Sequence, residues 1–147
     1  MRESPSVWAF PTILTLHTAG MGILVGASWL LDLRLLGVAA RNTPLSAFRW
    51  VFPAITFGLI VNLVTGVFLF IKNAATWGSA VPFGIKMLLV VASVVLLLPI
   101  RKYVVAPQPQ SGEGGEVGGN ARLLAIASIL AWTGAVTAGR LLAYLVV

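Results

Sequence analysis

Long runs of apolar residues, separated by short polar segments, organise the chain. Four runs have about the 20 residues that an α-helix needs to cross the hydrocarbon core of a bilayer; they span residues 7–31, 50–71, 81–104 and 121–147. Because backbone polar groups in lipid must be satisfied internally, such runs form helices that pack as a bundle. The pattern therefore predicts an all-α, integral membrane four-helix bundle, with residues 1–147 as a single transmembrane domain.

Two features bear on the boundaries of these runs. Pro99 lies near the end of the third run, where the missing N–H and the ring should bend or end the helix. The segment 106–120 is rich in Pro, Gly and Gln, a composition typical of a flexible tether without a core of its own.

Composition excludes several classes of protein. Hydrophobic residues make up 59% of the chain and charged residues 10%, whereas soluble domains carry about 25% charged residues. The chain has no cysteine, which excludes disulfides, iron–sulfur clusters and thiol catalysis within it. With one histidine and four acidic residues, a metal cage made only of protein ligands is not expected.

The net charge of +6 is explained by membrane topology. Basic residues cluster in the first and third loops, at Arg34, Arg41, Arg49, Arg101, Lys102 and Arg122. The positive-inside rule places these loops in the cytoplasm and both termini outside. The expected partners of these charges are lipid headgroups, and no nucleic acid is expected.

Small residues recur every four positions on three of the runs and predict close helix packing within the bundle. Asn62 lies within one of these stripes and is expected to form a hydrogen bond to a neighbouring helix. The stripes are Thr18, Gly22 and Gly26; Ala54, Gly58, Asn62 and Gly66; and Ala127, Ala131 and Ala135.

Three polar residues lie inside the apolar runs, where such residues are costly and require an explanation. His17, Lys86 and Arg140 fall in the same outer half of the bilayer, because successive helices alternate in direction. Two explanations remain open. Either the cations extend to the headgroups while a neutral His17 bonds a neighbouring Thr or Asn, or an anionic ligand completes a site.

Haem b fits these three residues together. Imidazole is a common ligand of haem iron, so His17 is the candidate metal ligand, and the two propionates would balance Lys86 and Arg140. One histidine cannot supply two axial imidazoles. The sixth ligand would be Lys86 as a neutral amine, Met21, Met87, a histidine of a second chain, water, or none.

Parts of the first and third helical segments resemble a known family. The runs LHTAG (16–20) and GASWLLDLRLLG (26–37), together with PFGIKMLLV (82–90), resemble the four-helix membrane superfamily of HemJ-type protoporphyrinogen oxidases and CopD-like proteins. The resemblance implies b-type haem at His17 and Lys86, and a bacterial inner membrane location. The chain lacks the second histidine and the proline–arginine run of HemJ-type proteins, so haem binding is implied more directly than protoporphyrinogen oxidation.

Three functions follow from these observations. The first is a small haem-b membrane protein that transfers electrons or oxidises a lipid-soluble substrate, a quinol or a porphyrinogen. The second is a non-enzymatic accessory subunit of a larger membrane complex, bound to a partner protein or to copies of itself. The third is a transporter or a copper-handling protein. The absence of cysteine and the presence of only three methionines argue against copper, although Met21, four residues after His17, lies on the same helical face as a soft ligand.

Overall fold

The fold consists of four long helices. The computed structural model describes residues 8–40, 42–105 and 119–145. Within them lie α1 (Ala9–Leu35), α2 (Val51–Trp77), α3 (Val81–Val105) and α4 (Gly119–Leu145), with a short 3₁₀ helix, η2 (Leu45–Trp50), directly before α2. Each α-helix is long and apolar enough to cross a membrane. The predicted all-α membrane bundle is therefore confirmed, and the chain is a multi-pass membrane protein.

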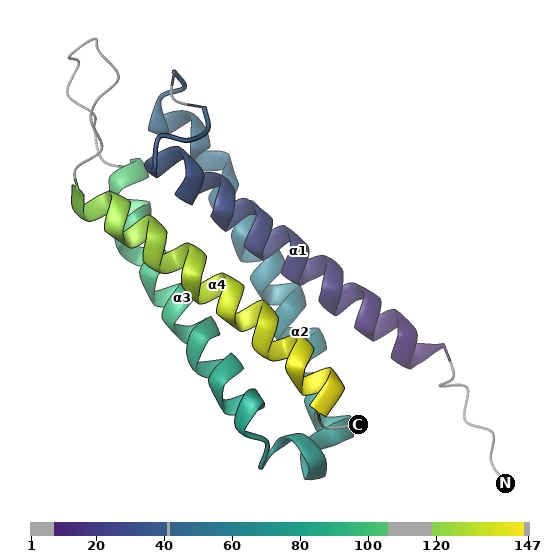
Figure 1. Ribbon diagram of the computed structural model, residues 1–147. Coiled ribbons are helices and arrows are strands. Elements are labelled where there is room, and N and C mark those ends of the chain that lie inside the picture. Colours follow the sequence, from purple (N-terminus) through teal and green to yellow (C-terminus); the bar gives the residue numbers. More distant parts are fainter. Residues whose placement is uncertain (1–7, 41, 106–118, 146–147) are drawn as a thin grey trace, which may run out of the picture.

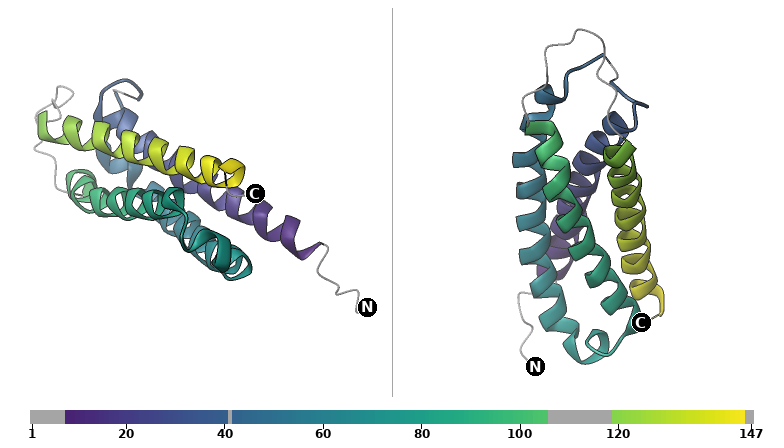
Figure 2. Two further views of the ribbon diagram at one scale, coloured as in Figure 1. Left: turned by 60° about the horizontal axis from the view of Figure 1, so that its bottom comes forward. Right: turned by 90° about the vertical axis from the view of Figure 1, so that its left-hand side faces the viewer.

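The helices are arranged as two pairs (Figures 1 and 2). α1 packs along α2, α3 packs along α4, and the two pairs meet mainly through α1 and α4. The start of α1, the α2–α3 turn and the end of α4 lie at one end of the bundle, which we call the turn end. The end of α1, η2 and the start of α4 lie at the other end, which we call the basic end.

Helix boundaries differ from the expected runs in two ways. α1 and α2 continue past the expected residues 31 and 71, to Leu35 and Trp77, and α4 already begins at Gly119. Residues 106–118 of the expected tether lie outside the described residues. The polar residues at these helix ends lower the hydropathy without ending the helix, so the apolar runs are shorter than the helices.

Pro99 does not end its helix. α3 runs through Pro99 to Val105, so the expectation that the helix ends there is wrong. Neighbouring helices can satisfy the carbonyl that a proline leaves free in a membrane bundle. The irregular backbone lies instead at Asn73 of α2 (φ −119°, ψ 18°), one turn before the end of that helix.

The bundle buries small and polar residues and exposes large apolar ones. Asp32, Ser28, Ser93 and Ser128 are fully buried. Large apolar side chains on the outer faces are more than half exposed, among them Phe57, Leu63, Leu88, Leu98, Leu123 and Leu130. In water this distribution would be costly, whereas in lipid the outer apolar surface is solvated by acyl chains.

The closest approach of two helices is between α1 and α2. A Cβ atom on Gly58 would lie 2.8 Å from the backbone nitrogen of Leu24 and 2.9 Å from the carbonyl oxygen of Gly20. A Cβ atom on Gly20 would in turn lie 2.9 Å from the Val61 side chain. Backbone is thus packed directly on backbone here, as small residues permit in membrane helices.

The predicted small-residue stripes are right in part. Gly58 does form the α1–α2 contact, but a Cβ atom on Gly22 or Gly26 would meet nothing within 4 Å. The contacting glycine of α1 is therefore Gly20. On α4, Ala131 and Ala135 are buried as expected, whereas Ala127 is exposed.

The contact at Gly58 leads to a prediction about stability. Gly58→Ala places a methyl group against backbone that cannot move aside, and overpacking of this kind costs about 1–3 kcal/mol. Thermal unfolding in detergent should therefore show a lower midpoint for this variant. Gly22→Ala is the matched control; it meets open space and should keep or slightly raise the midpoint because alanine favours helix. Equal losses in both variants would contradict the assigned contact.

Candidate functional site

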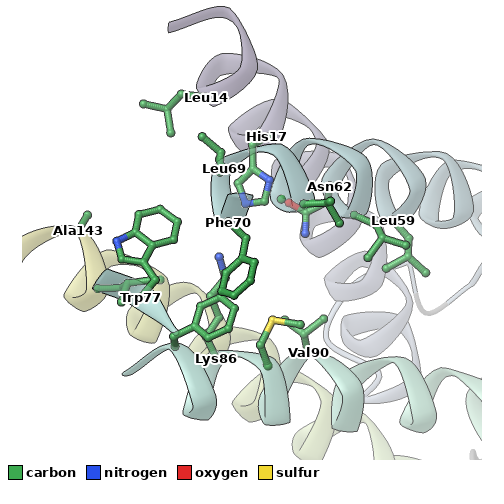
Figure 3. Close-up of a pocket in the computed structure, with 17 residues that line it drawn as sticks. Leu14, His17, Leu59, Asn62, Leu69, Phe70, Trp77, Lys86, Val90 and Ala143 are labelled. Atoms are coloured by element: carbon green, nitrogen blue, oxygen red, sulfur yellow. The ribbon is translucent and has the colours of Figure 1, made fainter. Parts of the chain in front are cut away.

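A pocket of about 330 Å³ lies toward the turn end of the bundle (Figure 3). All four helices contribute to its walls, and most of the lining is apolar. The lining residues are Leu14 and His17 of α1; Leu59, Asn62, Leu63, Gly66, Val67, Leu69, Phe70 and Trp77 of α2; Phe83, Lys86, Met87 and Val90 of α3; and Gly139, Leu142 and Ala143 of α4. Leu63 is 61% exposed, so one rim of the pocket faces the surface that lipid would cover.

His17 projects from α1 into this pocket. Its Nδ1 atom lies 2.9 Å from the hydroxyl oxygen of Thr65, a buried residue of α2. The Thr65 hydroxyl itself donates to the carbonyl oxygen of Val61 at 2.6 Å. Because a hydroxyl has a single proton, Thr65 accepts from His17, and Nδ1 must carry hydrogen.

This hydrogen bond fixes the chemistry of the ring. With the hydrogen on Nδ1, a neutral imidazole keeps its lone pair on Nε2. Within the described part of the chain, the side-chain hydrogen bond of His17 uses Nδ1 and a second contact is made to the backbone of Asn62, so Nε2 has no side-chain partner. The pocket therefore contains an imidazole nitrogen that can bind a metal or accept a proton.

Gly66 leaves room for the ring. A Cβ atom at this position would lie 3.2 Å from Cε1 of His17, closer than most Cβ contacts. Thr65 holds one edge of the imidazole while Gly66 lets the ring lie flat against α2. Both residues come from one turn of α2, opposite His17.

Lys86 enters the pocket from the other helix pair (Figure 3). It is half-buried on α3, and its Cε and Nζ atoms would lie 3.5 Å from a Cβ atom placed on Gly139 of α4. It is also close enough to His17 for charges on the two side chains to repel each other. The structure thus brings two of the three predicted site residues into one pocket.

Arg140 is not part of this pocket. It is exposed, although its neighbour Gly139 lines the pocket. Successive helical residues are turned by about 100° from each other, so Gly139 faces inward while Arg140 faces outward. Two methionines were also candidates for the sixth ligand of the iron. Met87 lines the pocket, whereas Met21 packs against the hydrophobic core.

Asn62, which the sequence marked as a packing residue, contributes a polar group to the pocket. The residue is buried, and its side-chain oxygen has no hydrogen-bond partner among the described residues. The expected hydrogen bond of Asn62 to a neighbouring helix is not made by this oxygen. Because Asn62 lines the pocket, the unpaired oxygen is an acceptor available to a ligand.

Aromatic side chains form the wall at the turn end. The rings of Phe70 and Phe83 stack with centroids 5.0 Å apart and an interplanar angle of 20°, which joins α2 to α3. Trp77 lies one turn beyond the irregular backbone at Asn73 and also lines the pocket. The sequence showed only aromatic residues near span ends, and their contribution to one pocket depends on the packing of α2 against α3.

Protein ligands alone do not form a metal site here. Within residues 8–40, 42–105 and 119–145, no group of three or more His, Cys, Asp or Glu side chains lies close enough to hold an ion. Any metal at His17 would therefore bring most of its ligands with it, as the iron of a macrocycle does.

The anchored ring leads to a prediction that nuclear magnetic resonance can test. Because the chain has one histidine, ¹⁵N labelling of histidine gives one pair of ring-nitrogen signals. We expect hydrogen on Nδ1 and a lone pair on Nε2 in the wild type at mildly alkaline pH. Thr65→Val removes the acceptor while keeping the side-chain shape, and should shift the population toward the other tautomer. Thr18→Val, on an exposed face of α1, should leave the signals unchanged.

Comparison with known proteins adds no family. The chain matches no protein-family model, and searches of curated proteins and of solved structures find no significant match. The fold and the pocket must therefore support any functional conclusion by themselves.

Proposed function

We propose that this pocket binds haem b through Nε2 of His17 and that the protein is a small membrane redox protein. The observation that carries the proposal is the hydrogen bond between Nδ1 of His17 and Thr65. Histidines that bind metals almost always donate their other N–H to a fixed acceptor, which sets the tautomer and the ring orientation. A half-buried imidazole with that arrangement in an apolar pocket is what an iron macrocycle requires.

The lining of the pocket supports the same ligand. Its walls are mostly apolar, and Phe70, Phe83 and Trp77 offer flat surfaces to a flat molecule. The unpaired oxygen of Asn62 provides an acceptor for a polar substituent. The volume of about 330 Å³ is at the lower end for small-molecule sites, and the rim at Leu63 is open to the outer surface.

Lys86 has two roles that exclude each other. As a neutral amine it would be a second ligand of the iron, and as an ammonium it would pair with a propionate. Because Arg140 lies outside the pocket lining, the proposal assigns the propionate contact within the pocket to Lys86 alone. Bound haem would supply one-electron transfer, while His17 and Thr65 orient it and the apolar walls exclude water.

A haem titration of the purified protein in detergent tests the proposal. We expect a Soret band that shifts on reduction, and its loss in His17→Ala. Thr65→Val should weaken haem binding about 10- to 100-fold, the usual effect of removing the partner of a metal-binding histidine. No Soret band with haem supplied, or an unchanged spectrum in His17→Ala, would refute haem binding at this site.

Matched lysine variants separate the roles of Lys86. Lys86→Gln should change the spectrum of the oxidised protein if the amine binds iron, and only the affinity if it binds a propionate. Lys72→Gln is the control, because Lys72 lies over the Phe10 ring, 4.0 Å from its centroid, and does not line the pocket. An effect of Lys72→Gln equal to that of Lys86→Gln would remove Lys86 from the site.

A quinone is the second candidate ligand, and the polar groups of the pocket favour it. Lys86 can donate to a quinone carbonyl, while Nε2 of His17 and the oxygen of Asn62 can accept from a quinol. The exposed rim at Leu63 would let a lipid-soluble molecule enter from the bilayer. Co-purification of a quinone, lost in His17→Ala and without a Soret band, would establish this function in place of haem binding.

A further inference from the structure

A second group of unpaired polar atoms lies away from the pocket, between α1 and α4. Asp32, three residues before the end of α1, has no exposed surface, and neither carboxyl oxygen has a hydrogen-bond partner among the described residues. Ser128 of α4 lies near this carboxyl group, and its hydroxyl oxygen is buried without a hydrogen-bond partner among the described residues. Trp132, one turn further along α4, is also buried with an unpaired indole Nε1.

The basic side chains at this end do not pair with Asp32. Arg34 of α1 donates to the carbonyl oxygen of Thr43 at 2.8 Å, and Arg49 of η2 donates to that of Val105 at 3.1 Å. Arg101 of α3 lies over the Phe52 ring. Two more basic residues, Lys102 of α3 and Arg122 of α4, are exposed. Within the described residues, Asp32 therefore faces polar neutral groups without a cation.

An ionised carboxylate cannot be stable in these surroundings. Removing an unpaired charge from water costs several kcal/mol even after relaxation of the protein. Asp32 is fully buried between two residues of the hydrophobic core on the same helix, Leu31 and Leu35, and Ala125 of the core lies one turn before Ser128 on α4. Metal ions such as Ca²⁺ take six to eight oxygen ligands, far more than Asp32 and Ser128 offer.

A single proton on the Asp32 carboxyl group would give both Asp32 and Ser128 a hydrogen-bond partner. A protonated carboxyl group has an O–H donor, and the Ser128 oxygen is an acceptor without a partner. Ser28, one turn before Asp32, shows how serine is otherwise satisfied here, since its hydroxyl donates to the carbonyl oxygen of Leu24 at 2.8 Å. Ser128 can donate its own hydrogen in the same way while it accepts from Asp32.

We propose that Asp32 and Ser128 form a proton-binding site at the α1–α4 interface, in which the bundle holds the Asp32 carboxyl group in its protonated form at neutral pH. The site is separate from the pocket. Asp32 of this site and His17 of the pocket are both on α1, 15 residues or about 22 Å of helix apart. It does not depend on haem binding or on quinone binding.

Infrared spectroscopy of the full chain tests the proposal directly. Besides Asp32, the acidic side chains are Glu3, Glu113 and Glu116, so Glu3→Gln/Glu113→Gln/Glu116→Gln leaves Asp32 as the only acidic side chain. At neutral pH this triple variant should show the carbonyl band of a protonated carboxylic acid, and adding Asp32→Asn should remove the band. Absence of the protonated-acid band in the triple variant would overturn the proposal, as would a protonated-acid band that survives Asp32→Asn.

The pH dependence of stability provides a second test. The solvated aspartate of the unfolded chain releases its proton as the pH rises, whereas the folded bundle retains it, so stability falls with rising pH. The thermal midpoint of the wild type should therefore fall, relative to that of Asp32→Asn, as the pH rises above about 4, the pKa of a solvated aspartate. His17 is present in both proteins, so the difference isolates Asp32. Parallel pH profiles would contradict the proposal.

A sodium series distinguishes a proton from a metal ion. The wild type is unfolded at constant ionic strength while sodium replaces choline. We expect an unchanged midpoint. A rise with sodium that Asp32→Asn removes would show that the carboxylate is ionised and holds a metal ion, and would overturn the proposal. Ser128→Ala should lower the midpoint at acidic pH, because the acid O–H then lacks its acceptor, and no loss there would remove Ser128 from the site.

Discussion

The contact between the backbones of α1 and α2 sets the geometry on which the pocket depends. Gly58 lies against Gly20 and Leu24, and this contact fixes the register of two antiparallel helices. One turn before Gly20 on α1 is His17, and two turns after Gly58 on α2 are Thr65 and Gly66. The hydrogen bond of His17 and the space for its ring are therefore consequences of a contact made elsewhere on the same two helices.

Because lipid surrounds this fold, large apolar side chains are not confined to its interior. Large apolar residues can face outward at no cost, and the interior holds serine, alanine and glycine beside large apolar side chains such as Leu24, Leu31 and Trp132. An interior of this kind can hold polar groups, but each of them still needs a hydrogen-bond partner. Most of the buried serines and threonines satisfy this requirement through a carbonyl oxygen one turn earlier, as Ser28, Ser93 and Thr65 do. Asn62, Asp32, Ser128 and Trp132 do not, and they mark the places where the chain departs from simple packing.

The sequence predicted the four helices because apolar length alone determines which segments can cross a bilayer. It also predicted that His17 and Lys86 share a depth, because depth follows from position along alternating helices. It did not predict which way a helix faces. Arg140 shares that depth but turns away from the pocket, and the contacting glycine of α1 is Gly20 where the sequence indicated Gly22 and Gly26. Rotation about the helix axis is set by the neighbouring helix, and the stripe of small residues did not fix it, since Gly20 lies two residues away from both Thr18 and Gly22.

Thr65 illustrates why the site itself could not be derived from the sequence. A threonine in a membrane helix usually bonds to its own backbone, and Thr65 does so. Its second function, as acceptor for His17 on another helix, exists only once the register of α1 and α2 is known. The Thr65 hydroxyl uses its hydrogen in the bond to Val61. It can therefore only accept from His17, so the hydrogen of the ring lies on Nδ1 and Nε2 is left for a ligand.

The arrangement of the two helix pairs connects the pocket with Asp32. His17, Asn62 and Thr65 belong to the α1–α2 pair, whereas Lys86 and Gly139 belong to the α3–α4 pair, so the width of the pocket depends on how the pairs are held together. They meet mainly through α1 and α4, and Asp32 and Ser128 face each other across that interface. Loss of a proton from Asp32 would place an unpaired charge in the contact that joins the pairs, which favours their separation at the basic end. The proton-binding site that we propose at Asp32 therefore lies in the same interface that holds the two walls of the pocket together.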